Sequence, residues 1–495
     1  MNALVEHLPA LQVVVPMLMA PVVLLLQPRG LAWLAATAVS LLAFAIAVDL
    51  TAEVMAGADV AYRMGNWPAP YGIELRVDAL SAMLLLIVTG ASSAALIAGR
   101  DSLAEKLPTY REPYFFAAWL LALAGMLGIV VSADAFNIFV FMEISSLASY
   151  ILIAAGRDRR ALPATFKYLV MGTIGATFYL IGVGLVYMMT GTLNLADMEL
   201  RINDVADQRP ILAAAGFITV GLALKAAIFP LHVWLPNAYT YAPHVVTAFF
   251  AACATKVSLY VLLRFDFVVF QQNLAGHEIQ FAMYLMPLAI LGILVGSAVA
   301  MFERNLKRLL AFSSVAQIGY MLLGASLVTA AGLTAATLHM FNHALAKGGL
   351  FLALAAIATV AAGSRLEDVA GLARRMPWTF AAFVLCALSL VGVPGTAGFI
   401  SKWYLIDAAL DFDSGGIALV GVIVVSSLMA VVYTWRIVEA AYFGKATPRD
   451  DVAVPRAMPV MIWTVAAANV VFGIAPELPL SLSASAAEIL LGRLQ

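Results

Sequence analysis

Charged residues are scarce in this chain of 495 amino acids, because Asp, Glu, Lys and Arg together make up only 12% of it. A soluble domain has about a quarter of its residues charged, whereas here 63% are hydrophobic. The formal net charge is −1, so the charge balance gives no reason to expect nucleic acid or another acidic partner. This composition excludes an ordinary soluble protein and predicts one that lies in a membrane.

Cysteine and nucleotide-binding motifs are nearly absent. The two cysteines, Cys253 and Cys386, both lie in apolar stretches and form no CxxC pair, so they cannot hold an iron–sulfur cluster by themselves. We interpret them as small buried hydrophobic residues. There is no phosphate-binding P-loop, and Gly172 and Gly175 lie inside an apolar stretch rather than after a strand. We therefore expect no nucleotide, no redox cofactor and no metal.

Long apolar runs are abundant, and a spanning helix needs about 20 such residues. Windows of that length predict an all-α polytopic membrane protein with about fourteen transmembrane helices. The first apolar stretch lacks a basic start and merges into further spans, so we expect a first transmembrane helix rather than a cleavable signal peptide. The predicted spans are 8–26, 30–50, 77–99, 113–131, 134–155, 164–190, 209–229, 243–265, 281–302, 307–329, 332–361, 378–408, 416–443 and 457–476.

The segments between the spans predict an orientation. Residues 57–76 contain Gly, Pro and aromatic residues and predict an extramembrane hairpin or loop, and the tail from Pro479 predicts a short amphipathic helix. With the N-terminus outside, most Lys and Arg residues of the connections fall on the inner side, as the positive-inside rule requires. We therefore expect a multi-pass protein of the bacterial inner (cytoplasmic) membrane with its N-terminus outside.

A few basic residues remain within the predicted spans, and all but one are lysines. Arginine keeps its proton at any physiological pH, whereas a buried lysine can titrate. Charges inside a membrane are costly and usually functional. The basic residues within the predicted spans are Lys225, Lys256, Lys347, Lys402 and Arg436.

Glu143 lies in the middle of a predicted span and is a natural partner for Lys225, although a static ion pair that locks two helices is an alternative. Buried ion pairs stabilise a fold poorly compared with apolar packing, which favours a functional pair.

Pro230 follows Lys225 by five residues, and Pro394 precedes Lys402 by eight. Each proline is expected to free a helix carbonyl, that of Ala226 or of Leu390. Two broken helices in corresponding halves of a chain indicate a transport site within an inverted repeat, although two ordinary kinks are possible. We therefore divide the chain into N-terminal helices with an external loop (1–110), two inverted five-helix repeats (111–265 and 281–445), and a C-terminal helix and tail (446–495).

The remaining titratable residues form stripes on single helices. Tyr260 lies one turn after Lys256, and His339, His343 and Lys347 follow one another at intervals of four. Histidine titrates near neutral pH, so this stripe predicts a proton relay. Hydrogen-bonded core histidines are one alternative, and a metal site at the two histidines is a weaker one, because no third ligand is near in the sequence. A polar face on the preceding span, formed by Ser313, Gln317 and Tyr320, could hold water.

Three motifs resemble those of a known family, the antiporter-like subunits shared by respiratory complex I and Mrp-type cation/proton antiporters. They are NLKRLLAFSSVAQIGY at 305–320, PLHVWLPNAY at 230–239, and HALAKGGLF at 343–351, which resembles the family's broken eleventh span. The resemblance covers nearly the whole chain. It implies fourteen helices, two inverted repeats and a hydrophilic axis across the membrane.

By this resemblance, the proton-transfer residues are Glu143, Lys225, Lys256, His343, Lys347 and Lys402, and the supporting residues are His339, Pro230, Pro394, Gln317 and Tyr260. Gln317 departs from the family, since some complex I relatives place histidine there. Lys402 is glutamate in one complex I subunit, which argues against that subunit. GFISKWY at 398–404 most resembles the D-type subunit of Mrp antiporters. The resemblance implies a proton-translocating subunit of a multi-subunit Na⁺/H⁺ antiporter.

Three other functions stay open. A proton-pumping subunit of an NADH:quinone oxidoreductase or a membrane-bound hydrogenase fits the same residues. An enzyme proper lacks a nucleophile or cofactor motif, and a purely structural scaffold would not need lysines within its spans. The partners expected are other membrane subunits, protons, Na⁺ and lipid, with no nucleic acid.

Overall fold

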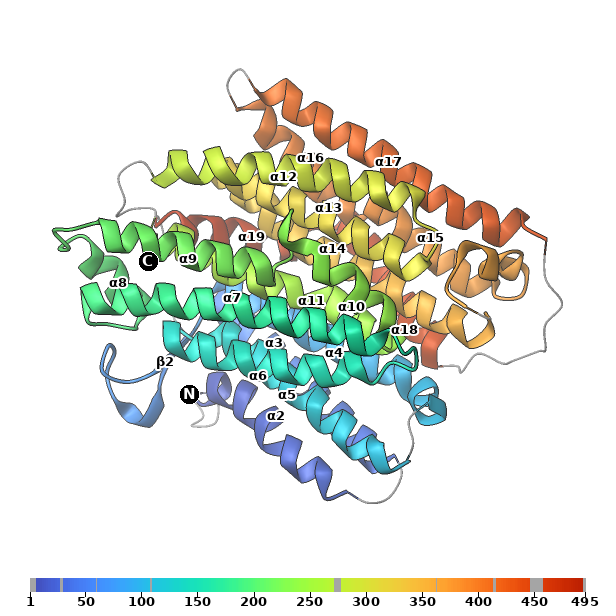
Figure 1. Ribbon diagram of the computed structural model, residues 1–495, viewed down its shortest axis with the longest axis horizontal. Helices are drawn as coiled ribbons and strands as arrows, with labels where there is room; N and C mark the ends of the chain where they lie inside the picture. The colour runs from blue at the N-terminus through green and yellow to red at the C-terminus, as the bar shows by residue number, and fades with distance from the viewer. Residues whose placement is uncertain are drawn as a thin grey trace.

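The computed structural model describes residues 6–26, 30–58, 60–106, 109–270, 277–361, 363–412, 415–445 and 457–492. Helices lie roughly side by side in one bundle (Figure 1), as expected where backbone groups in lipid must be satisfied within their own segment. The longer helices are α2 (Leu8–Leu24), α3 (Leu31–Met55), α4 (Ala79–Lys106), α5 (Glu112–Val131), α6 (Ala135–Ala154), α7 (Ala161–Thr190), α9 (Arg209–Lys225), α11 (His244–Leu263), α12 (His277–Phe302), α13 (Leu306–Ser326), α14 (Ala330–Val360), α15 (Pro377–Val391), α16 (Ala397–Leu410), α17 (Gly416–Phe443), α18 (Ala457–Ile474) and α19 (Glu477–Leu490).

Every predicted span contains a helix, so the all-α polytopic membrane fold is confirmed. Among the described residues, eleven helices are long and apolar enough to cross a membrane, or twelve if one bent pair counts as a single span. The number of fourteen is not confirmed, because α2 and α9 have only 17 residues each and residues 378–408 are divided between α15 and α16.

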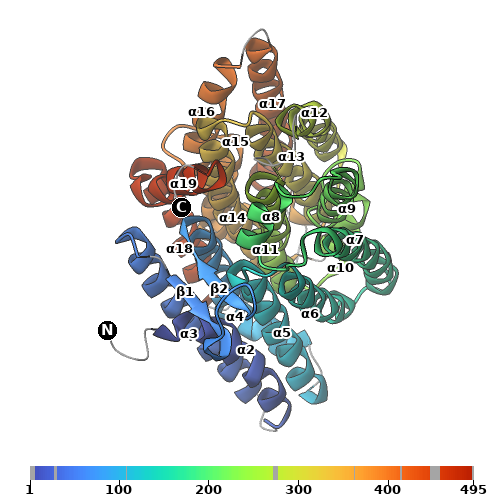
Figure 2. The ribbon, with the colours of Figure 1, turned by 90° about the vertical axis from the view of Figure 1, so that its left-hand side faces the viewer.

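A small sheet caps one end of the bundle. Strands β1 (Val60–Arg63) and β2 (Glu74–Val77) are antiparallel, with Val60 opposite Val77, which confirms the predicted hairpin. The short helix α8 (Leu195–Ile202) and α19 lie at the same end (Figure 2). The C-terminal tail is helical, as predicted, and begins slightly earlier, at Glu477.

The interior of the bundle is formed by α11 and α14, which pack against each other between the N-terminal helices and the α12–α17 group (Figure 2). Both helices are buried along most of their length. Helix α14 is continuous over 31 residues, so the break that the motif at 343–351 suggested is wrong. The two glycines of this motif are accommodated within the helix, since a single glycine costs a helix only about 1 kcal/mol.

Two pairs of helices are in backbone contact through glycines. A Cβ atom on Gly221 of α9 would lie 2.5 Å from the carbonyl oxygen of Gly175 on α7. One on Gly125 of α5 would lie 2.6 Å from the amide nitrogen of Ser145 on α6. Small residues are the usual means of such close approach between membrane helices. The α5/α6 and α7/α9 pairs are therefore tightly joined units.

Two helices end where the sequence predicts breaks. Helix α9 stops at Lys225, and the chain continues through a 3₁₀ turn, Leu231–Trp234, into α10 (Leu235–Tyr241). The expected role of Pro230 is wrong in detail, because the helix has already ended before the Ala226 carbonyl. Pro394 lies in the gap between α15 and α16. There the prediction is confirmed, since the Leu390 carbonyl is free to accept a hydrogen bond from Lys402.

Candidate functional site

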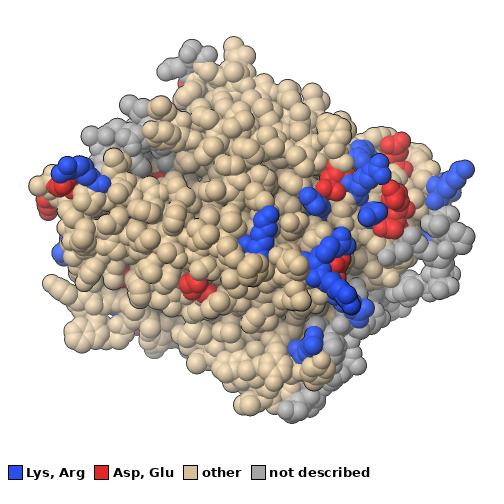
Figure 3. All heavy atoms as spheres, viewed as in Figure 1, with Lys and Arg blue, Asp and Glu red and all other residues tan. Residues whose placement is uncertain are grey.

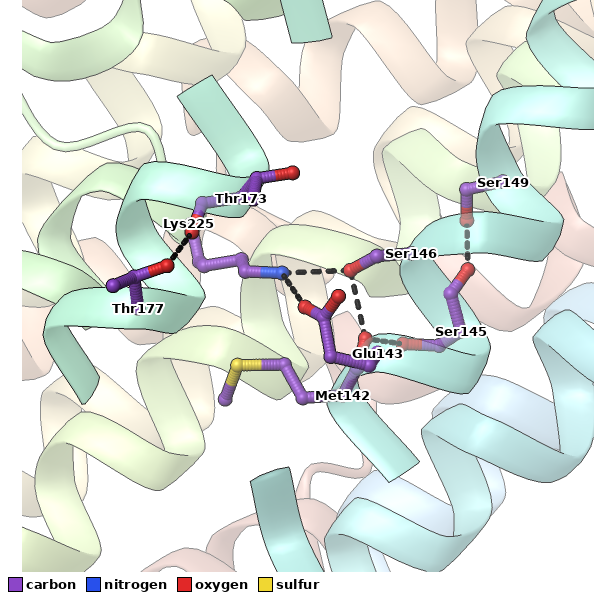
Figure 4. A network of polar contacts seen from close by, with 8 residues as sticks. All are labelled: Met142, Glu143, Ser145, Ser146, Ser149, Thr173, Thr177 and Lys225. Atoms are coloured by element: carbon purple, nitrogen blue, oxygen red, sulfur yellow. Dashed lines mark hydrogen bonds and ion pairs between the residues drawn. The ribbon is translucent and has the colours of Figure 1, made fainter. Parts of the chain in front are cut away.

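Glu143 and Lys225 meet between α6 and α9. The Lys225 Nζ lies 3.4 Å from Glu143 Oε1 and donates a hydrogen bond of 2.7 Å to Ser146 Oγ (Figure 4). The lysine side chain is 5% exposed and the glutamate 29%, so the pair is only half enclosed by protein. The predicted partnership of the two residues is thus present in the structure.

The Gly175–Gly221 contact positions this lysine. Gly221 lies one turn before Lys225 on α9, and a Cβ on Gly175 would also lie 3.3 Å from Lys225 Cγ. Trp234, beyond the break, donates from Nε1 to the Leu224 carbonyl at 2.9 Å and stacks on Tyr168 of α7. Lys225 therefore sits at a helix end that is fixed from both sides.

Lys256 lies on α11 and is 1% exposed. Its Nζ donates to the Ala251 carbonyl of the same helix. Tyr260, predicted to share its face, donates instead to the Val130 carbonyl at 2.8 Å and lies 3.2 Å from Ser81 Oγ. Lys256 is thus held by a neutral carbonyl, and Tyr260 ties α11 to α4 and α5.

Lys347 lies on α14 and is fully buried. Its Nζ donates to the Leu310 carbonyl at 2.7 Å and to Ser313 Oγ. The predicted polar face of residues 313–320 therefore faces the stripe of His339, His343 and Lys347 on α14. These acceptors are neutral, so they can bind the lysine without fixing it as one half of an ion pair.

The two histidines of α14 differ in their partners. His339 uses both ring nitrogens, one with Ser401 Oγ at 2.9 Å and one with Gln317 Oε1 at 2.8 Å. His343 stacks on it at 6.2 Å between ring centroids, and neither of its buried ring nitrogens has a partner. Buried nitrogens are costly to leave unpaired, so His343 is less well satisfied in this arrangement than His339. With both nitrogens of His339 engaged, the geometry does not favour the metal alternative.

Lys402 lies at the first turns of α16, facing the end of α15. Its Nζ donates to the carbonyls of Leu390 at 3.2 Å and Val391 at 2.8 Å, and to Ser427 Oγ of α17 at 3.0 Å. It also lies 4.9 Å from the centre of the Tyr320 ring. The broken helix thus presents its freed carbonyls to the lysine.

Several of the predicted residues lie buried on three neighbouring helices. His339 stacks on His343, and Lys347 follows on the same face of α14. Ser401, the hydrogen-bond partner of His339, directly precedes Lys402 on α16, and Lys256 lies on α11, which packs against α14. Lys225 and Glu143 form a second group on α9 and α6. The structure brings the predicted residues together as two groups, one on α6/α9 and one on α11, α14 and α16.

Sequence reasoning missed several polar contacts. Ser401 directly precedes Lys402 in the sequence, so it could have been named as a candidate partner for a buried histidine. Ser427 comes from α17 and gave no local signal. Arg264, the residue directly after α11, is buried and forms an ion pair with Asp78. This pair lies one turn beyond Tyr260 and closes the end of α11.

Residues 132–430 match the family described as "NADH:quinone oxidoreductase/Mrp antiporter, TM". A relative from Desulforudis audaxviator, named as the N-type subunit of an NADH-quinone oxidoreductase, is 42% identical over 92% of this chain and 90% of its own length. A relative from Alkalihalophilus pseudofirmus, named as the D-type subunit of an Na⁺/H⁺ antiporter, is 29% identical over 82% of this chain and 81% of its own length.

Solved structures of three membrane complexes contain similar chains. One from an archaeal membrane-bound sulfane sulfur reductase has a TM-score of 0.91 at 29% identity, covering 99% of this chain and 100% of its own. One from the Mrp complex of Dietzia sp. has 0.89 at 29%, covering 99% and 98%. One from respiratory complex I of Thermus thermophilus has 0.74 at 26%, covering 97% and 100%. The family match over residues 132–430 and the 42% identical relative show that this multi-pass membrane protein belongs to the NADH:quinone oxidoreductase/Mrp antiporter membrane family.

Proposed function

We propose that this chain is a proton-translocating subunit of a multi-subunit monovalent cation (Na⁺)/H⁺ antiporter of the bacterial cytoplasmic membrane, with its N-terminus outside. The observation that carries the proposal is the burial of titratable side chains on the packed helices α11, α14 and α16, namely Lys256, His339, His343, Lys347 and Lys402. Lysines in such a place are costly to bury, and they usually mark an ion or proton pathway. The chain acts as a transporter subunit, with no redox centre of its own.

Protons are taken up from the inner side at the Glu143–Lys225 pair, pass to Lys256, and continue by way of water and His343 to Lys402. Close to Glu143, Lys225 holds its proton, because an opposite charge favours the charged form. When the two separate, burial favours release. The membrane potential supplies about 2.3 kcal/mol per charge for each 100 mV, which is comparable with the cost of neutralising a buried lysine.

A proton-pumping subunit of an NADH:quinone oxidoreductase or a related respiratory complex is the second candidate. It is favoured by the 42% identity with the N-type relative from Desulforudis audaxviator. In TM-score the Mrp chain, at 0.89, lies above the complex I chain, at 0.74, but beside the chain of the archaeal sulfane sulfur reductase, a respiratory complex, at 0.91, so structural similarity supports both candidates. Both candidates use the same buried residues.

Purification of the native complex with identification of its other chains separates the two candidates. Small membrane subunits without cofactors are expected for the antiporter, together with sodium-dependent proton movement in everted vesicles. Co-purifying subunits that bind iron–sulfur clusters would overturn the antiporter in favour of the respiratory complex.

A further inference from the structure

A cavity of about 410 Å³ opens at the end of the bundle where α7, α11 and α13 begin. Four connections from the two halves of the chain line it, those from α6 to α7, α10 to α11, α12 to α13, and the one after α14. Its residues belong to none of the proton-transfer positions described above. A water molecule occupies about 30 Å³ of liquid, so the cavity has room for a ligand with several non-hydrogen atoms.

Positive charges outnumber negative ones around this cavity. Four of its lining side chains are cationic, Arg157, Arg160, Lys307 and Arg365, and two are carboxylates, Asp158 and Asp368. Asp158 is engaged by Arg160 at 2.6 Å, and Asp368 accepts from the Arg365 backbone nitrogen at 2.9 Å. Figure 3 shows charged side chains gathered at this end of the bundle and few along its midsection.

Lys307 makes the cavity a built site rather than a patch of surface lysines. It is 2% exposed, and its Nζ donates to the Ala242 carbonyl at 2.6 Å. The neighbouring connections are joined by backbone hydrogen bonds, with Leu306 donating to the Ser364 carbonyl at 2.7 Å. The positions of the cations are thus set by the fold.

Helix ends add to the positive potential. Helices α7, α11 and α13 all start at the cavity, and the aligned peptide dipoles of a helix give its N-terminus about half a positive charge, although Asn305 caps α13. No side chain caps the N-terminus of α7 or α11. Backbone amides and basic side chains that converge on one space are the usual elements of a phosphate site.

We propose that this cavity binds an oxyanion of the phosphate class. Fixed positive charge raises the cost of bringing in a cation, so the cavity suits neither sodium nor a hydrated proton as occupant. Two sources carry the required group, a free phosphate and the headgroup of an anionic phospholipid. The proposal is independent of the direction and coupling of transport, because it uses none of the transport residues.

The test uses the full chain, purified with its co-purifying subunits in detergent and freed of phosphate. Inorganic phosphate is titrated against chloride at constant ionic strength, and binding is followed by calorimetry and thermal unfolding. Arg160→Gln and Arg365→Gln alter exposed side chains and are expected to fold normally. Together they should weaken phosphate binding about tenfold or more, since they remove two of the four cationic side chains that line the cavity.

Arg209→Gln is the matched control, because Arg209 forms a similar exposed pair with Asp207 at 2.9 Å far from the cavity. It should bind phosphate like the unchanged protein. In a second arm, the same proteins are placed in nanodiscs of phosphatidylcholine with or without cardiolipin. Loss of phosphate binding only when cardiolipin is present identifies the lipid headgroup as the occupant, whereas unaltered binding identifies free phosphate.

Two results would overturn the proposal. One is the absence of saturable phosphate binding in detergent together with no effect of cardiolipin on stability that the two substitutions remove. The other is binding that is equally strong in the double variant and in Arg209→Gln.

Discussion

The lysines at the two helix breaks have different hydrogen-bond and charge partners. On the α9/α10 side, Lys225 has a carboxylate 3.4 Å away on another helix. On the α15/α16 side, Lys402 has only neutral oxygens, two backbone carbonyls and a serine hydroxyl. The same device, a lysine at a helix break, is therefore built once with a counter-charge and once without.

This difference bears on how each lysine can change its charge. The neutral form of Lys225 becomes favourable only when Lys225 separates from Glu143. Its protonation state therefore depends on the distance between α9 and α6. Lys402 is bound by dipoles that accept its hydrogen bonds in one fixed arrangement. We expect Lys225 to act as the controlled position and Lys402 as the terminal one.

The largest effect is expected from breaking the charged pair. Lys225→Ala and Glu143→Ala should each leave the complex assembled and reduce proton transport to background, since each removes half of the switch. Proton movement in everted vesicles measures this, with the amount of assembled complex determined by immunoblot. Normal transport by either assembled variant would refute the role of the pair.

Replacing Lys402 by an acidic residue should reduce transport less than breaking the Glu143–Lys225 pair. Lys402→Glu would point a carboxylate at the carbonyls of Leu390 and Val391, all of them acceptors. An unmatched buried acceptor costs about 1–3 kcal/mol, which corresponds to a loss of about fivefold to about 150-fold in transport rate. Unchanged activity in the vesicle assay would mean that any titratable group suffices there.

Packing on the α7/α9 side gives a third test. Gly221→Val would force side-chain atoms into the α7 backbone, and overpacking of this kind costs about 1–3 kcal/mol. We expect a lower midpoint of thermal unfolding and impaired transport. Gly216→Val on the same helix is the control, because nothing lies within 4 Å of a Cβ there. Equal effects of the two substitutions would show that the glycine contact does not position Lys225.

The smallest effect is expected from removing the serine hydroxyl that accepts a hydrogen bond from each lysine. Ser427→Ala leaves Lys402 with two carbonyls, whereas Ser146→Ala leaves Lys225 with Glu143 alone. One such hydrogen bond contributes about 1 kcal/mol, or about fivefold in rate. Ser146→Ala should therefore reduce transport more than Ser427→Ala. The reverse order would contradict the comparison drawn above.

Much of the fold follows from the sequence, because apolar length and breaks are local properties. The span boundaries, the hairpin and the two helix breaks were predictable for that reason. Lys225 and Glu143 were predictable as partners because few charges are available within the membrane. The acceptors of Lys402 and the ion pair of Arg264 with Asp78 were not, because they depend on which helices pack together. The continuous course of α14 through Gly348 and Gly349 reflects tertiary packing that overrides local propensity.

The glycine contacts have a mechanical consequence. Helices α5 and α6 are locked backbone to backbone at Gly125, and α7 and α9 at Gly221, while Glu143 belongs to the first pair and Lys225 to the second. The ion pair therefore joins two tightly packed helix pairs, α5/α6 and α7/α9. Packed helices slide past one another by small shear steps of about 1–2 Å. A shift of that size of one helix pair relative to the other would separate the two charges without bending any helix.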